Sequence, residues 1–419
     1  MHQTPPSPKP SQRPLWVMLF ALTTAFALSQ AYRTVAAIMA APLQADFQLD
    51  ARALGLFAGA FHFAFGAMQL FMGISLDLHG VRRTVLTAFP VAIAGSLVSA
   101  LATSYAMLVA GQVLIGIGCA PAFLVCTVFI ARHLPAERFA AISGLTLGLG
   151  GIGMLLTGTP LAWLIEATSW RMGFAVLGGC AALAWGLIYA WVHEPPLPAA
   201  ALQAALAHPK ETLLQAIGKF GALFTLPHTL GIVLLAAVGY ASFISLRGLW
   251  LGPLLMQRHG FSLVQSGNVA LAMSLVSLFG PPLFGRFDPG PLQRRRWIVG
   301  FYGLLAGLFA TLAMTHSTWV DVVGPLVIGL LSGIFVLQYA DVRTSYPAAI
   351  TGRAMAVLTM AMFLGVAGMQ WLTGVVASAA TAQGIEPFTA VFAMIAALLV
   401  AGALAFTVLP GPPPLQTPV

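Results

Sequence analysis

The chain has 419 residues, of which 59% are hydrophobic and only 7% are charged, and its formal net charge is +8. This composition excludes an ordinary soluble domain, whose surface needs far more charge. The positive charge requires no nucleic acid partner, because basic loops beside an anionic lipid surface account for it.

Apolar runs long enough to cross a lipid bilayer recur along the whole chain. About 20 helical residues span a hydrocarbon layer about 30 Å thick, and continuous apolarity favours helices over a closed barrel. We expect an all-α integral membrane protein with twelve transmembrane helices. In chain order the predicted helices are Leu15–Leu43, Arg52–Leu76, Thr84–Thr103, Tyr105–Ala131, Phe139–Glu166, Trp170–Val192, His228–Gln257, Leu263–Gly285, Trp297–Thr315, Thr318–Arg343, Arg353–Ala380 and Ile385–Leu409.

These helices form two hydrophobic blocks of six around a polar segment. The expected organisation is a cytoplasmic N-terminal tail (1–14), an N-terminal six-helix bundle (15–193), a central cytoplasmic loop (194–221), a C-terminal six-helix bundle (222–409) and a cytoplasmic C-terminal tail (410–419).

The distribution of basic residues predicts the orientation, because cytoplasmic loops retain Lys and Arg during insertion. Fourteen of these residues fall on one side of the predicted topology, and three, Arg52, Arg171 and Arg258, fall on the other. We therefore expect a multi-pass protein of the cytoplasmic (inner) membrane with both termini in the cytoplasm.

Residue types that bind metals or attack substrates show no functional spacing. The three cysteines lie inside predicted helices, the nine histidines are scattered, and no phosphate-binding loop or nucleophile motif occurs. We expect no cofactor, no metal site and no enzymatic activity.

Three features recur in the same order in both halves, as expected of a duplicated six-helix unit. A proline precedes an intramembrane arginine in the first and seventh helices, as Pro14 with Arg33 and Pro227 with Arg247. Acidic and basic residues follow the second and eighth helices, and an Arg–Pro pattern follows the fourth and tenth. The repeat indicates two bundles related by a pseudo-two-fold axis.

The segment after the second predicted helix has the pattern Gly-x-x-x-Asp-x-x-Gly-x-Arg-Arg, formed by Gly73, Asp77, Gly80, Arg82 and Arg83. With this pattern, Pro135–Arg138 and Trp170–Arg171, the chain resembles the major facilitator superfamily over residues 15–409. The resemblance implies a twelve-helix transporter. The chain departs from the family pattern at Leu78 and Gln112, and it lacks the drug-antiporter signature of the fifth helix, which weakens a multidrug function.

Charged residues at the cytoplasmic helix ends form a candidate gate. Asp77 can accept hydrogen bonds from a neighbouring helix N-terminus and pair with Arg82 or Arg83. The alternative is a short turn fixed by Gly80, with charges that only set the topology. Asp341 with Arg343 is the expected ion pair of the second half. The candidate gate residues are Gly73, Asp77, Gly80, Arg82, Arg83, Arg138, Asp341 and Arg343.

Arg33 and Arg247 are candidate substrate-binding residues, because a charge within a bilayer is retained only where it faces a cavity or a partner. They lie at matching depths in their helices, without an obvious acidic partner. Two guanidiniums can hold an organic or inorganic anion, and the arrangement is similar to the organophosphate and anion antiporter branches of the family. Alternatively, each arginine reaches the water interface or meets an unforeseen acidic residue. The other candidate substrate-binding residues are Tyr32, His62, Tyr240, Trp250, Gln338 and Gln370.

These observations predict a secondary active transporter that moves a small anionic solute by alternating access. His62 is the best candidate for proton coupling, and exchange against a counter-anion is the other expected source of energy. A proton-coupled exporter of hydrophobic or cationic compounds is the first alternative. A non-transporting membrane sensor on the same fold is the second. We expect a monomer in the lipid bilayer.

Overall fold

The computed structural model describes residues 13–135, 138–193 and 213–412, and this part of the chain contains helices and no strands. Within it, twelve helical spans are long and apolar enough to cross a membrane, and each overlaps one of the predicted helices. The prediction of an all-α protein with twelve transmembrane helices is confirmed. Both predicted tails and the central loop fall largely outside the described residues.

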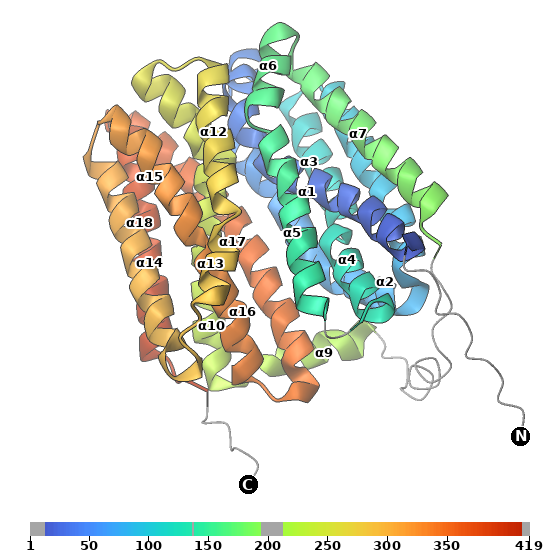
Figure 1. Cartoon of the computed structure of the whole chain (residues 1–419). Coiled ribbons are helices and arrows are strands. Elements are labelled where there is room, and N and C mark those ends of the chain that lie inside the picture. The colour runs from blue at the N-terminus through green and yellow to red at the C-terminus, as the bar shows by residue number, and fades with distance from the viewer. Residues whose placement is uncertain (1–12, 136–137, 194–212, 413–419) are drawn as a thin grey trace, which may run out of the picture.

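The described part of the first bundle contains seven α-helical elements (Figure 1). The element α2 contains two of the predicted membrane spans, which are joined by a non-helical turn at Gly80 with φ 78° and ψ 177°. Glycine adopts this conformation without the steric strain that a side chain would add. The helices are α1 (Arg13–Phe47), α2 (Ala51–Ala100), α3 (Tyr105–Cys119), α4 (Ala122–His133), α5 (Phe139–Leu156), α6 (Thr159–Ala167) and α7 (Trp170–Trp191).

The second bundle follows the short helix α9 (Leu213–Leu223), and several of its membrane spans are interrupted. The span that begins with α10 (Pro227–Ser245) continues through the π-helical turn η2 (Leu246–Trp250), α11 (Leu251–Pro253) and a second π-helical turn, η3 (Leu254–Arg258). The remaining elements are α12 (Leu263–Ser277), α13 (Gly280–Arg286), α14 (Pro291–Met314), α15 (Thr318–Leu331), η4 (Ser332–Ile334), α16 (Phe335–Ser345), α17 (Ala348–Ala382) and α18 (Pro387–Val408).

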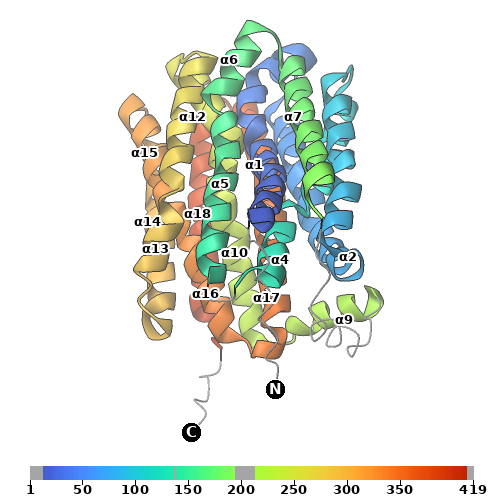
Figure 2. The same ribbon diagram turned by 45° about the vertical axis from the view of Figure 1, so that its right-hand side comes forward.

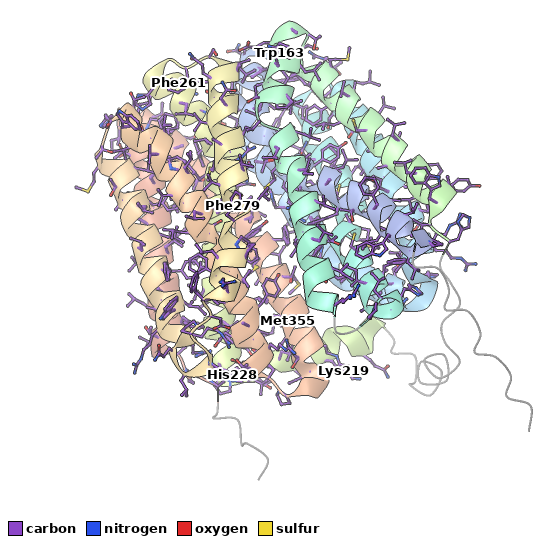
Figure 3. The ribbon with its side chains drawn as sticks, in the orientation of Figure 1. Trp163, Lys219, His228, Phe261, Phe279 and Met355 are labelled. Atoms are coloured by element: carbon purple, nitrogen blue, oxygen red, sulfur yellow. The ribbon has the colours of Figure 1, made fainter. Side chains whose placement is uncertain are left out.

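Two ends of the molecule are distinguished below. The termini end is the end at which α9 lies beside α17, and the distal end is the opposite one, at which α6 lies beside α12 (Figures 1 and 2). In Figure 3, Trp163 and Phe261 mark the distal end, and Lys219 and His228 mark the termini end.

The two bundles pack tightly against each other toward the distal end. There α2 packs on α17, α1 packs on η2 and α11, and α12 packs on α5 and α6. Side chains added at Gly55 or Gly158 would overlap the backbone of the other bundle. By contrast, Gly73 and Gly352, toward the termini end, have no neighbouring atom within 4 Å of an added Cβ. The bundles are therefore close-packed at the distal end and looser toward the termini.

Candidate functional site

Arg33 lies on α1 between aromatic rings of both bundles. Its guanidinium carbon is 4.6 Å from the ring centroids of Phe65 on α2 and of Phe363 on α17. The side chain is buried, its Nε has no hydrogen-bond partner among the described residues, and it forms no ion pair with any of them. Aromatic faces attract a cation but leave its charge in place. Arg33 is thus a buried cation without a counter-ion in the described part of the chain.

Several polar side chains beside Arg33 are also buried with unused hydrogen-bonding atoms. The His62 ring stacks on Phe363 with 6.4 Å between centroids, and its Nδ1 lies 3.2 Å from the Ala58 carbonyl oxygen. Its Nε2 and both amide atoms of Gln370 have no partner among the described residues. The Oε1 of Gln338 on α16 is also without a described partner, but no contact places it beside Arg33. Unused polar atoms are unfavourable in a buried site, so a bound polar solute can satisfy them.

Aromatic rings of the second bundle complete this cluster. The Tyr240 ring on α10 lies 5.7 Å from the Phe363 ring and 6.0 Å from the Phe335 ring. The site around Arg33 therefore combines a cation, the Gln370 amide and aromatic faces from α1, α2, α10, α16 and α17.

Arg247 lies in the π-helical turn η2 and is completely buried. Its Nε donates to the Ser274 hydroxyl at 2.7 Å, and its Nη2 donates to the Met154 carbonyl oxygen at 2.9 Å. Met154 precedes the end of α5 at Leu156, so its carbonyl is one of those that the helix leaves unused. The contact with Met154 joins the second bundle to the first.

The two arginines are close along the backbone but have different partners. A Cβ added at Gly248 would lie 2.9 Å from the Arg33 carbonyl oxygen, so η2 crosses α1 beside Arg33. The Arg33 side chain contacts α2 and α17, whereas the Arg247 side chain contacts α5 and α12. Both arginine side chains are buried in this structure.

Tyr32 and Trp250, two further predicted substrate-binding residues, have partners within their own bundles. The Tyr32 hydroxyl hydrogen-bonds to Ser96, inside the first bundle. The Trp250 Nε1 donates to the Thr373 hydroxyl at 2.9 Å. In this conformation both side chains are engaged in packing between helices.

The predicted gate residues are distributed over the termini end. Gly80 forms the predicted turn, and Arg82 donates to the Tyr189 carbonyl oxygen at 3.1 Å. The side chain of Asp77 lies outside the described residues. Gly73 is within α2, and the side chains of Arg83 and Arg138 are exposed.

The expected pair of Asp341 with Arg343 is wrong. Asp341 instead accepts two hydrogen bonds of 3.1 Å from Arg295, and Arg343 is exposed. Arg343 lies two residues from Asp341 on the same helix, and residues at that spacing face different directions. Nearby, Asp288 pairs with Arg294 at 2.6 Å, and the hydrogen bonds from Arg294 lower the pKa of the Asp288 carboxyl.

Sequence reasoning missed a charged cluster at the distal end of the second bundle. Arg258 donates to both oxygens of Glu386 at 2.7 and 2.6 Å and to Asp321 at 2.9 Å. His259 Nε2 lies 2.7 Å from the same Asp321 oxygen. The cluster fastens η3 to the first turns of α15 and α18. Three charges far apart in sequence gave no signal of their contact.

Twelve membrane-spanning helices in two packed bundles, with buried arginines where the bundles meet, are typical of a membrane transporter. The family model described as Major Facilitator Superfamily matches residues 19–369. The chain therefore belongs to the major facilitator superfamily.

Named relatives and solved structures agree with this membership. The chain is 25% identical over 346 residues to the "Probable sulfoacetate transporter SauU" of Cupriavidus necator, covering 79% of this chain and 80% of that protein. It is 26% identical over 303 residues to the 4-hydroxybenzoate transporter PcaK of Pseudomonas aeruginosa, covering 65% of each. The crystal structure of the nucleoside transporter NupG has the same fold, with a TM-score of 0.73 and 17% identity over 94% of this chain and 98% of that one. These proteins are transporters, not enzymes.

Proposed function

We propose that the protein is a secondary transporter that moves a small organic anion by alternating access, with Arg33 as the principal anion-binding residue and Arg247 as the second. The observation that carries this proposal is the buried Arg33 guanidinium, which has no ion pair with any described residue. An uncompensated buried cation is unfavourable, and a carboxylate, sulfonate or phosphate compensates it through charge-assisted hydrogen bonds.

The groups around Arg33 suit an organic anion rather than a bare inorganic ion. Gln370 offers an amide donor and acceptor, and Phe65, Phe363 and Tyr240 offer aromatic faces for a carbon skeleton. Sulfoacetate and 4-hydroxybenzoate, which appear in the names of two relatives, are both organic anions.

In the proposed arrangement the protein is a monomer in the inner membrane, and the termini end faces the cytoplasm. The excess of basic residues on that side supports this orientation. The cargo exchanges against a second anion, or His62 carries a coupled proton. The fold supplies two packed bundles that can rock around the site near Arg33.

The test is ligand stabilisation of purified protein by sulfoacetate, 4-hydroxybenzoate and glucuronate, against choline and sucrose. A ligand at 100 times its Kd should add about 2.7 kcal/mol of stability. We expect stabilisation by at least one anion, abolished by Arg33→Gln and weakened by Arg247→Gln. Arg52→Gln is the matched control, because Arg52 is exposed at the distal end. Uptake of the stabilising anion into proteoliposomes then distinguishes a transporter from a sensor.

A proton-coupled exporter of hydrophobic or cationic compounds is the second candidate. It is favoured by one observation, an apolar groove of about 590 Å³ between α1, α5 and the end of α7. Its lining includes Trp16, Phe20, Leu145 and Trp191. Stabilisation by apolar cations alone, unaffected by Arg33→Gln, would replace the anion proposal with this one.

A further inference from the structure

A cavity of about 420 Å³ lies at the distal end, between the two bundles. Its walls come from the end of α1, the start of α2, the segment from η2 to η3, the end of α17 and the start of α18. Small-molecule binding sites commonly have a volume of this size. The polar residues of its lining are Gln44, Asp50, Gln257, Ser378 and Thr381.

The charges around this cavity are predominantly negative. Among the described residues that line it, only Asp50 is charged. Behind the lining residue Phe388, Arg258 is shared by the carboxylates of Glu386 and Asp321. One arginine between two carboxylates leaves an excess negative charge while the neighbouring histidines are neutral. A cation is therefore favoured in the cavity over an anion.

Two aromatic rings form part of the apolar wall of the cavity. The Trp250 and Phe388 rings lie 6.2 Å apart between centroids, with an angle of 85° between their planes. The only polar atom of the Trp250 side chain, Nε1, is already used, because it donates to the Thr373 hydroxyl at 2.9 Å. The rings therefore offer apolar surface and π-electron density, which suit a flat ring and a positive charge.

We propose that this cavity is a binding site for an organic cation that carries an aromatic ring. The cationic group lies at the Asp50 carboxylate, and the ring lies against Trp250 and Phe388. The inference goes beyond the proposed function and does not depend on it, because the proposed cargo is an anion held beside Arg33.

A ligand in this cavity contacts both bundles at once. At the edge of the cavity the Arg52 backbone amide donates to the Ser378 hydroxyl at 3.0 Å, and the Gln257 amide donates to the Gln44 side-chain oxygen at 3.5 Å. Separation of the bundles at the distal end would take the walls apart. The ligand therefore favours the closed distal end, since it binds that form best. It inhibits transport from the distal side without occupying the site at Arg33.

The test measures the binding of three indole probes to the full chain in nanodiscs by isothermal titration calorimetry. Tryptamine is the cationic probe, tryptophol has a hydroxyl in place of the ammonium, and indole-3-acetate is the anionic probe. Empty nanodiscs measure the partition of each probe into lipid. We expect tryptamine to bind at least about tenfold more tightly than tryptophol, the scale of one charge-assisted hydrogen bond.

Two variants locate the binding site, and a third is the control. Asp50→Asn removes the charge but keeps an oxygen that can cap α2 by accepting from the Ala53 amide, so it should remove the preference for tryptamine. Thr381→Phe fills the cavity from an exposed position and should abolish tryptamine binding. Glu166→Gln changes an exposed distal carboxylate outside the lining and should bind tryptamine like the parent.

Distances between spin labels test the effect on the distal end. Labels are placed at Trp163→Cys and Trp319→Cys, two exposed positions in different bundles. The background carries Cys180→Ala, because Cys180 is exposed. Tryptamine should increase the population of the shorter distance in the parent and not in Thr381→Phe.

Three results would overturn the inference. The first is the absence of tryptamine binding to the parent, or equal affinity for tryptamine and tryptophol. The second is binding that Asp50→Asn and Thr381→Phe leave unchanged, as expected if tryptamine binds elsewhere as an exported cargo. The third is tighter binding of indole-3-acetate that Thr381→Phe abolishes, since the cavity would then hold an anion. None of these results decides the proposed function, which is tested separately by Arg33→Gln.

Discussion

At the scale of single residues, the site is defined by polar atoms that the protein does not satisfy itself. The Gln370 amide is fully buried, and neither of its polar atoms has a hydrogen-bond partner among the described residues. The Arg33 guanidinium lies against the Phe65 and Phe363 rings and has no ion pair there. A packed protein core rarely leaves such groups unused. Their concentration where two bundles meet is the local sign of a ligand-binding site.

One residue-scale prediction concerns pH at the distal end. Burial alone would raise the pKa of the Glu386 carboxyl, but hydrogen bonds from Arg258 and Thr389 lower it from its ordinary 4.5 to about 2. A carboxyl with a lowered folded-state pKa stabilises the fold above its ordinary pKa, and this contribution is lost as the pH falls toward the lower value. We expect Glu386→Gln to lower the Tm at neutral pH and to flatten the decrease of Tm below about pH 4.5.

The matched control is Glu166→Gln, measured by the same thermal unfolding scans. Glu166 accepts a hydrogen bond from the Val264 backbone amide at 3.1 Å, which a glutamine oxygen can also accept. It should change the pH profile little. Identical profiles for Glu386→Gln and the parent would show that the Arg258 cluster does not contribute to stability.

At the scale of elements, the turn at Gly80 restricts which residue can occupy its position more strictly than the helices on either side of it do. Gly80 has φ 78° and ψ 177°, a region open essentially to glycine alone. We expect Gly80→Ala to destabilise the protein by about 1–3 kcal/mol, the usual scale of such backbone strain. Thermal unfolding in detergent measures it.

Gly73→Ala, in the helix that precedes the turn, provides the comparison for that prediction. Gly73 is helical and has no atom within 4 Å of an added Cβ, so alanine should be tolerated there. Equal stability of the Gly80→Ala and Gly73→Ala variants would mean that a side chain at the Gly80 turn adds no backbone strain. A loss of transport by Gly73→Ala without a loss of stability would instead support a gating role.

At the scale of the whole molecule, alternating access requires that the distal contact can both form and break. A Cβ at Gly55 on α2 would overlap the Gln370 carbonyl oxygen on α17. We expect Gly55→Ala to weaken distal closure, because backbone cannot move aside as a flexible side chain can. Spin labels at Trp163→Cys on α6 and Trp319→Cys on α15, two exposed positions in different bundles, should report a longer mean distance.

Gly179→Ala is the control for this prediction, because Gly179 has open space around it on α7. An unchanged distance in Gly55→Ala would indicate that α2 and α17 adjust locally. Such a result would mean that the close contact of Gly55 with Gln370 is not required for closure of the distal end.

The sequence was a good guide to the helices and a partial guide to the site. Hydropathy predicts twelve spans because each must cross the same hydrocarbon thickness, and the sixth, Trp170–Val192, differs from α7 by one residue. Arg33 and Arg247 stand out in the sequence because a charge within the hydrocarbon layer is costly. Their partners cannot be recognised in the sequence. Phe65 resembles any other apolar residue of a membrane helix, and Met154 contributes only its backbone carbonyl.

Ion pairs were the least predictable feature. Asp341 was assigned to a neighbour in sequence, but Arg295 reaches it from another helix. Which long basic side chain meets a given carboxylate depends on how helices cross, and sequence spacing carries no such information.

The two equivalent inner helices of this pseudo-symmetric protein differ mechanically. α1 is a single α-helix of 35 residues with one internal proline, Pro42, near its distal end, whereas its counterpart is divided into α10, η2, α11 and η3. A π-helical turn has weaker restraint on bending than the α-helix around it. Between its N-terminus and Pro42 the first membrane span has no such interruption, so we expect the seventh span to bend more easily than the first, at the π-helical turn that carries Arg247.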